Sequence, residues 1–206
     1  MRADGSPGSS ACTPWELAFA DPRVQEEIWG EDNDTWMASP YAPMGVATPV
    51  DGGYVLKGRW SFSSGTDHCQ WAFLGAMVGD GEGGIAMPPS SLHVILPRTD
   101  YQIVEDTWDV IGLRGTGSKD LIVDGAFVPG YRTLNASKVM DGRAQKEAGR
   151  PEPLFNMPYS CMFPLGITAA SSVSPRARWP VTSRCRRTAS PSRARRSRRI
   201  PTCSVR

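Results

Sequence analysis

The sequence lacks the features that mark membrane-spanning, secreted and zinc-binding proteins. No run of about 18 apolar residues occurs, so we expect no membrane-spanning helix. The start, MRADGSPGSSACTPW, has no apolar core of the signal-peptide kind, which predicts a cytoplasmic protein. The five cysteines include no C-x-x-C pair. This spacing suits a reduced compartment and argues against structural zinc.

Acidic residues are absent from Ser171–Arg206, although eleven of the 23 basic residues lie there. The other 12 basic residues stand against all 21 acidic ones, so Met1–Ala170 carries a net charge of −9. The tail's Arg, Ser and Pro residues cannot build a core, and we expect disorder. Out-of-frame translation of GC-rich DNA gives such a composition, and we interpret the tail as aberrant, without function. Nucleic-acid binding by its arginines is the less favoured alternative.

Histidine is scarce, with only His68 and His93. The Asp-His-Cys turn at 67–69 does not supply the three or four convergent ligands that a metal site needs, so we predict no metal. His68 could serve as an acid or base, but a hydrogen-bonded structural histidine is commoner. The segment GLRGTGSKDLIV lacks the spacing of a phosphate-binding loop and runs into strand residues, so a structural turn is favoured.

Glycine and proline are abundant, with 21 and 18 residues, which favours turns and a β-rich chain. Asp51-Gly52 predicts a tight hairpin. Further strand patterns are WAFLGAMV, SLHVILP, YQIVED and DLIVDGAFVP. Short strands with frequent turns predict an antiparallel barrel or sandwich, and the lack of β-α-β alternation excludes a Rossmann fold.

Helical patterns flank these strands. Near the start, Asp21 can cap a helix whose first position is Pro22, Val24 and Ile28 share one face, and Gly30 is a plausible stop. After Pro129 the strand pattern ends, and LFNMPYSCMFPLGITAA reads as the beginning of an apolar helix.

Two long stretches resemble a known family. EEIWGEDNDTWMASPYAPMGVATPVDGGYVLKGRWSFSSGTDHCQWAFLGA and WDVIGLRGTGSKDLIVDGAFVP resemble the oxygenase component of two-component flavin-dependent monooxygenases, which hydroxylate phenolic and steroid-derived aromatic rings. Such enzymes share the acyl-CoA dehydrogenase fold, with an N-terminal helical domain, a middle β-domain and a C-terminal helical bundle. The loops SPYAPMG and WSFSSG stand where acyl-CoA dehydrogenases carry other motifs, so the dehydrogenase reading is the alternative.

The resemblance assigns flavin contacts to two segments. They are Ser39, Pro40 and Tyr41, and Phe62, Ser63 and Ser64, with Trp60, Phe62 or Tyr41 sheltering the ring. A flavin ring is apolar on its faces and polar along one edge, so hydroxyls and backbone amides suit that edge. By the resemblance, a serine of the pair Ser63-Ser64 is the implied catalytic group, the hydrogen-bond donor near N5 that holds the flavin adduct; the alternative is that both serines cap a turn.

The resemblance also implies a division of the chain and a set of partners. Residues 1–36 are a remnant of the helical domain, 37–130 the flavin-binding β-domain, 131–170 a linker with the start of the bundle, and 171–206 the tail. The implied cofactor is FMN, supplied reduced by a flavin reductase, with FAD less favoured; the implied substrate is aromatic, and the family assembly is a tetramer. Because the chain lacks most of both helical domains, we expect it to be inactive alone. A non-catalytic binding module is a further alternative.

Overall fold

A computed structural model describes residues 15–149, 152–157, 159, 161 and 164. The predicted tail, Ser171–Arg206, lies outside the described residues. Among them, no helix is both long and apolar enough to span a membrane. The helices are the 3-10 turn η1 (Trp15–Phe19), α1 (Pro22–Trp29), η2 (Thr66–His68), η3 (Arg98–Asp100), η4 (Arg114–Thr116), η5 (Gly130–Arg132), α2 (Ala136–Met140), α3 (Arg143–Glu147) and η6 (Pro153–Asn156).

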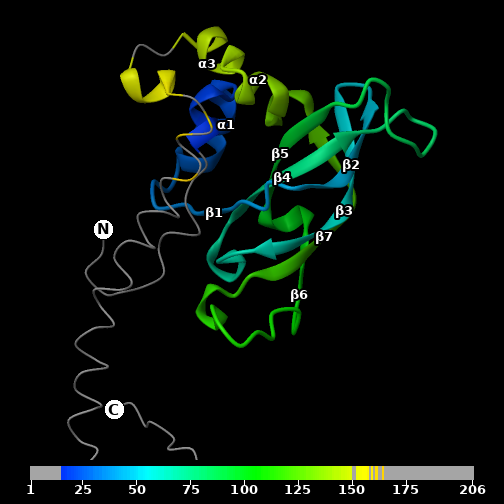
Figure 1. The fold of residues 1–206 in the computed structure, drawn as a ribbon, viewed down its shortest axis with the longest axis vertical. Helices are drawn as coiled ribbons and strands as arrows, with labels where there is room; N and C mark the ends of the chain where they lie inside the picture. The colour runs from blue at the N-terminus through cyan, green and yellow to red at the C-terminus, as the bar shows by residue number, and fades with distance from the viewer. Residues whose placement is uncertain (1–14, 150–151, 158, 160, 162–163, 165–206) are drawn as a thin grey trace, which may run out of the picture. The chain divides into compact units, whose positions relative to one another are not determined.

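Eight strands form one curled sheet with the order β6-β7-β3-β2-β4-β5-β8, and β1 pairs with β4 beside this path. The helices α1, α2 and α3 lie together at one end, and the loop after β6 lies at the other (Figure 1). The strands are β1 (Met37–Ala38), β2 (Pro43–Val50), β3 (Gly53–Ser63), β4 (Trp71–Val78), β5 (Ser91–Pro97), β6 (Gln102–Val104), β7 (Lys119–Pro129) and β8 (Thr133–Asn135).

The predicted hairpin is confirmed. Val50 pairs with Gly53 across the turn, and Gly52 takes φ +77°, a left-handed conformation that glycine adopts without strain. The mainly β fold is confirmed too. However, the sheet is open, with β6 and β8 at its two ends, so a closed barrel or a sandwich is not confirmed. Two pairings, β2 with β4 and β1 with β4, are parallel where antiparallel neighbours were expected.

The predicted first helix is also confirmed. The side chain of Asp21 accepts a hydrogen bond from the backbone N–H of Arg23, and Pro22 occupies the first turn. Val24 and Ile28 are buried on the helix face that packs toward Phe73 of β4. The amphipathic spacing therefore places α1 against one face of the sheet.

The other face of the sheet curls around the largest apolar cluster. Trp60 is its largest fully buried side chain, with no exposed surface. The cluster comprises Ala47, Leu56, Trp60, Ala72, Leu74, Ala76, Leu92, Val94, Leu96, Tyr101, Leu121, Val123 and Val128. Close packing of this kind makes the strand framework rigid, so the turns at the strand ends are held from beneath.

Candidate functional site

The predicted segment 62–64 lies at the end of β3, where the chain leaves the sheet in a tight turn. Phe62 has φ +62° and is 70% exposed, an uncommon conformation for a bulky residue. The N–H of Ser64 donates to the carbonyl of Phe62 at 2.9 Å. Ser63 is fully buried, and its Oγ has no hydrogen-bond partner among the described residues. A strained backbone with an unpaired buried hydroxyl is typical of functional turns.

The predicted segment 39–41 connects β1 with β2. The carbonyl of Pro40 accepts a hydrogen bond from the N–H of Gly75 at 3.1 Å. The Tyr41 ring packs edge-on against Phe73, with centroids 5.5 Å apart. The Oγ of Ser39 is buried and, within the described part of the chain, has no partner. Each segment therefore carries a buried hydroxyl that pairs with none of the residues that the structure describes.

Trp60 and Gly75 connect the two segments. The indole N–H of Trp60 donates to the carbonyl of Gly75 at 2.7 Å, while the N–H of Gly75 binds Pro40. A Cβ on Gly75 would collide with the backbone carbonyl of Tyr41, so only glycine lets this segment lie so close to β4. The framework under both segments is thus continuous.

Trp60 lies inside the core, and not beside the bound ring as the sequence interpretation suggested. That interpretation allowed Trp60 to shelter a bound ring, but its side chain has no exposed surface and is packed among core residues. The indole lies against Gly45 of β2, where any side chain would collide with it. Trp60 therefore supports the site from below, and the solvent-facing aromatic side chain of this strand is Phe62.

A chain of hydroxyl groups lies beside the turn, and the sequence interpretation missed it. The Ser64 and Ser118 Oγ atoms are 2.7 Å apart, and Ser118 Oγ lies 2.6 Å from Thr116 Oγ1. Thr116 also accepts the N–H of Gly65 through its carbonyl, at 2.8 Å. The polar run Gly-Thr-Gly-Ser at 115–118 was the available signal, but nothing in its spacing showed which turn it would meet.

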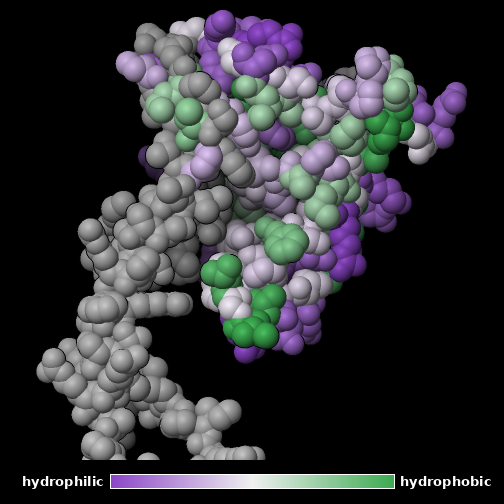
Figure 2. All heavy atoms as spheres, in the orientation of Figure 1, coloured by the Kyte–Doolittle hydropathy of each residue, from purple (hydrophilic) through white to green (hydrophobic). Residues whose placement is uncertain are grey.

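Apolar side chains surround the exposed side of the turn. Phe62 meets Trp108 edge-to-face, with centroids 5.8 Å apart. Ile111 and Leu113, in the loop after β6, are strongly exposed. Apolar atoms gather over this loop at the end of the molecule opposite the helices (Figure 2). An apolar surface next to the hydroxyls of the turn has the mixed character that suits a flat ring with apolar faces and one polar edge.

His93 is a buried titratable group that the sequence did not single out. It pairs with Gly75 across β4 and β5, and its ring lies 4.8 Å from Phe73 and 5.7 Å from Tyr41. Burial lowers the pKa of His93 to about 4, so the imidazole is neutral near neutral pH. Its Nδ1 has no partner among the described side chains and backbone. The other histidine, His68, is exposed at the end of η2.

Ion pairs fix the surroundings of the turn. The Lys119 Nζ lies 2.6 Å from a Glu105 oxygen and 2.9 Å from an Asp67 oxygen. Hydrogen bonds to Glu105 and Asp67 raise the pKa of Lys119, so this side chain stays charged. In the part of the chain that the structure describes, no cluster of three His, Cys, Asp or Glu side chains could hold a metal ion.

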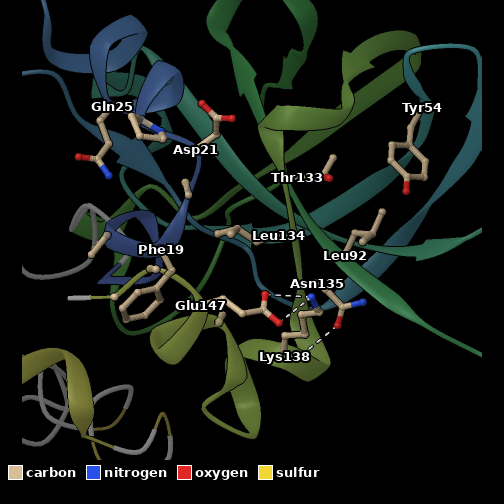
Figure 3. A pocket seen from close by; sticks show the side chains of 16 residues that line it. Phe19, Asp21, Gln25, Tyr54, Leu92, Thr133, Leu134, Asn135, Lys138 and Glu147 are labelled. Carbon is tan, nitrogen blue, oxygen red and sulfur yellow. Dashed lines mark hydrogen bonds and ion pairs between the residues drawn. The ribbon is translucent and has the colours of Figure 1, made fainter.

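A cavity of about 930 Å³ lies between the helices and the β5–β8 edge, and no residue of either predicted segment lines it. Figure 3 shows Lys138 and Glu147 joined across its floor, at 2.9 Å, and the Asn135 side chain accepting from the Lys138 backbone. These polar groups satisfy one another, whereas the hydroxyls of Ser39 and Ser63 have no partner in the described part of the chain. The two segments are therefore the better candidate site.

Comparison with known proteins identifies relatives of this chain. No protein-family model matches the chain. It is 66% identical over 158 residues to a pigment production hydroxylase of Rhodococcus erythropolis, covering 77% of this chain and 40% of that protein. The flavin-dependent monooxygenase oxygenase subunit HsaA of Mycobacterium tuberculosis is 44% identical over 156 residues, 75% of this chain and 38% of HsaA. The HsaA crystal structure superimposes with a TM-score of 0.67.

The chain is a homologue of flavin-dependent monooxygenase oxygenase components. A third relative, the oxygenase component of an FADH2-dependent resorcinol hydroxylase from Rhizobium, is 37% identical over 76% of this chain and 39% of its own length. The chain thus spans about two fifths of the length of the oxygenase components it matches. The resemblance seen in the sequence is confirmed, and so is the partial coverage.

Proposed function

We propose that residues 37–130 form the flavin-binding domain of an oxygenase component that hydroxylates an aromatic ring. The observation that carries this is a pair of buried hydroxyls, Ser39 Oγ and Ser63 Oγ, that have no partner among residues 15–149 and the other described residues. One lies on each segment that the family resemblance assigns to the flavin. Leaving a buried polar group unpaired costs about 1–3 kcal/mol, so a ligand with a polar edge would be stabilised here.

In this proposal each residue has a defined role. Ser64, which is half-buried, meets the polar edge of the ring. The buried hydroxyls of Ser39 and Ser63 pair with further polar atoms of the ligand when the two segments open to admit it. Phe62 and Tyr41 supply apolar contact and exclude water. When bound, reduced flavin supplies the oxygen-activating chemistry by which one oxygen atom of O2 reaches the substrate.

The cofactor and partners follow from the relatives. Oxygenase components receive flavin already reduced, so a separate flavin reductase is the expected partner, and the resorcinol hydroxylase points to a phenolic substrate. The sequence favoured FMN over FAD. Because that relative's name specifies FADH2, we propose reduced flavin as the ligand and treat both as probes. Tetramer formation remains a prediction of the family resemblance, and the cytoplasmic location remains a prediction from the sequence pattern.

We further propose that the chain is inactive alone. Residues 1–36 are then a remnant of the N-terminal helical domain, and residues 131–170 a linker with the start of the C-terminal helical domain. The rest of these two domains would cover the other side of the flavin. The relatives are more than twice as long as the matched region, which supports this division. The exposed side chains of Phe62, Ile111 and Leu113 are consistent with a surface that a complete enzyme covers.

The test is an anaerobic titration of Met1–Arg206 with reduced FAD and reduced FMN, followed by turnover with a supplied reductase and resorcinol. We expect weak binding, with dissociation constants of about 0.1–1 mM, and no hydroxylation, because only part of the contact surface is present. Ser63→Ala should weaken binding about fivefold, the value of one hydrogen bond. The matched control is Ser137→Ala on the exposed surface of α2.

Each outcome discriminates between the claims. Micromolar binding or hydroxylation would contradict the proposed inactivity. Absence of binding at millimolar flavin would contradict the flavin site and favour a non-catalytic module. Equal affinities for Ser63→Ala and Ser137→Ala would remove Ser63 from the site.

A further inference from the structure

The hydroxyl chain at the β3 turn has a defined direction. Thr116 Oγ1 lies 2.9 Å from the carbonyl oxygen of Leu113. A carbonyl can only accept, so the single hydroxyl proton of Thr116 is used in this bond. Thr116 Oγ1 must then accept the proton of Ser118 across their 2.6 Å contact.

The position of the hydroxyl proton of Ser64 follows in the same way. Because Ser118 donates to Thr116, it has no proton left and must accept from Ser64 across 2.7 Å. The order of donation is therefore Ser64, Ser118, Thr116, Leu113 carbonyl. Ser118 is only 3% exposed, so water cannot readily replace any of its partners.

This order leaves Ser64 with lone pairs but without a free proton. Any further partner of Ser64 Oγ has to be a hydrogen-bond donor. The surrounding contacts keep Ser64 in place: the N–H of Gly65 is bound by Thr116, and Phe62 packs on Trp108. Ser63, the neighbouring serine, belongs to no such chain, and its hydroxyl can donate or accept.

We propose that Thr116 and Ser118 are positioning residues that hold Ser64 as a hydrogen-bond acceptor, so that the site favours reduced over oxidised flavin. This rests on the proposed flavin site. A reduced flavin ring carries an N–H at N5, where the oxidised ring has only an acceptor nitrogen. An acceptor at Ser64 attracts the N5–H group of reduced flavin and repels the N5 lone pair of oxidised flavin. This preference suits a protein that receives its flavin already reduced.

The test compares the dissociation constants of reduced and oxidised FMN, titrated anaerobically into the full chain and into three variants. In the unaltered chain, reduced FMN should bind about fivefold or more tightly than oxidised FMN, the value of one hydrogen bond. Ser118→Ala releases the Ser64 proton, so the two constants should approach each other. Thr116→Val lets Ser118 donate to Ser64 instead, so the preference should reverse.

Thr116→Ser is the matched control, because it keeps the hydroxyl and should keep the preference. If the hydroxyl chain had only a structural role, Ser118→Ala and Thr116→Val would weaken the binding of both forms of FMN equally. The ratio of the two dissociation constants would then be unchanged. That result would overturn the inference while leaving the flavin site intact. Binding of neither form by the unaltered chain would overturn the flavin site, and this inference with it.

Discussion

The indole N–H of Trp60 lies 2.7 Å from the carbonyl oxygen of Gly75, whose own N–H binds Pro40. Through this pair of bonds, the segment at 39–41 and the turn at 62–64 share one rigid support. Their relative position then depends on a buried indole that faces no solvent.

Trp60→Phe should lower the free energy of unfolding by about 1–3 kcal/mol, because it leaves the buried carbonyl of Gly75 without its donor. Urea denaturation measures this. The control is Trp36→Phe at a partly exposed site, where we expect a change within about 0.5 kcal/mol. Equal effects of the two substitutions would show that the indole N–H does not stabilise the framework.

Gly75→Ala should displace the segment at 39–42, because the added Cβ would collide with the backbone carbonyl of Tyr41. Overpacking of this kind costs about 1–3 kcal/mol. Gly115→Ala is the control, since a Cβ there meets nothing within 4 Å. The amide chemical shifts of Ser39, Tyr41 and Ala42 should move in the first variant only; unchanged shifts would contradict the close approach.

Glu16 should make the protein less stable as the pH rises. Burial raises the pKa of Glu16 to about 7 from 4.5. Hydrogen bonds with its own backbone and with Tyr159 lower this pKa, but burial has the larger effect. The neutral form is favoured in the folded state, so this contribution is complete below about pH 4.5 and is lost as the pH rises through 7. The loss is about 3 kcal/mol.

Glu16→Gln removes this pH dependence, so the variant should exceed the unaltered chain in stability at about pH 8 and match it at about pH 4. Urea denaturation at both pH values checks this. Glu82→Gln, in an exposed loop, serves as the control. A pH profile that Glu16→Gln leaves unchanged would show that the Glu16 carboxyl is hydrated.

His93 should act in the opposite direction. Its pKa is lowered by burial to about 4 from 6.5, so the unfolded chain binds a proton where the folded chain does not. This contribution to stability is complete above about pH 6.5 and is lost as the pH falls through 4, by about 3 kcal/mol. His93→Gln should abolish the loss, and His68→Gln, at an exposed residue, should not. Identical acid profiles for both variants would contradict the burial of His93.

Much of the fold could be predicted from local patterns. The Asp21–Pro22 helix start and the Asp51-Gly52 turn depend on neighbouring residues, and both are present. The parallel pairing of β2 with β4 could not be predicted, because it joins strands that are separated along the chain by the whole of β3.

The candidate site was proposed from the family resemblance and not from residue spacing, and its flavin contacts stay a prediction. The interior position of Trp60 depends on Gly45 and Gly75, whose missing side chains make room for the indole and for the Tyr41 backbone. The contact of Ser64 with Ser118 spans 54 residues, and only the completed β3–β7 pairing brings them together. Long-range pairing of this kind leaves no local signal.

The most direct test of the central claim is a map of backbone amide shifts in the isotope-labelled chain during anaerobic titration with reduced FAD. We predict that the largest shifts occur at Ser39, Tyr41 and residues 62–65, with smaller shifts at 116–118, and that Ser63→Ala reduces them. Shifts confined to the cavity around Lys138 and Glu147, with residues 39–41 and 62–65 unchanged, would contradict it.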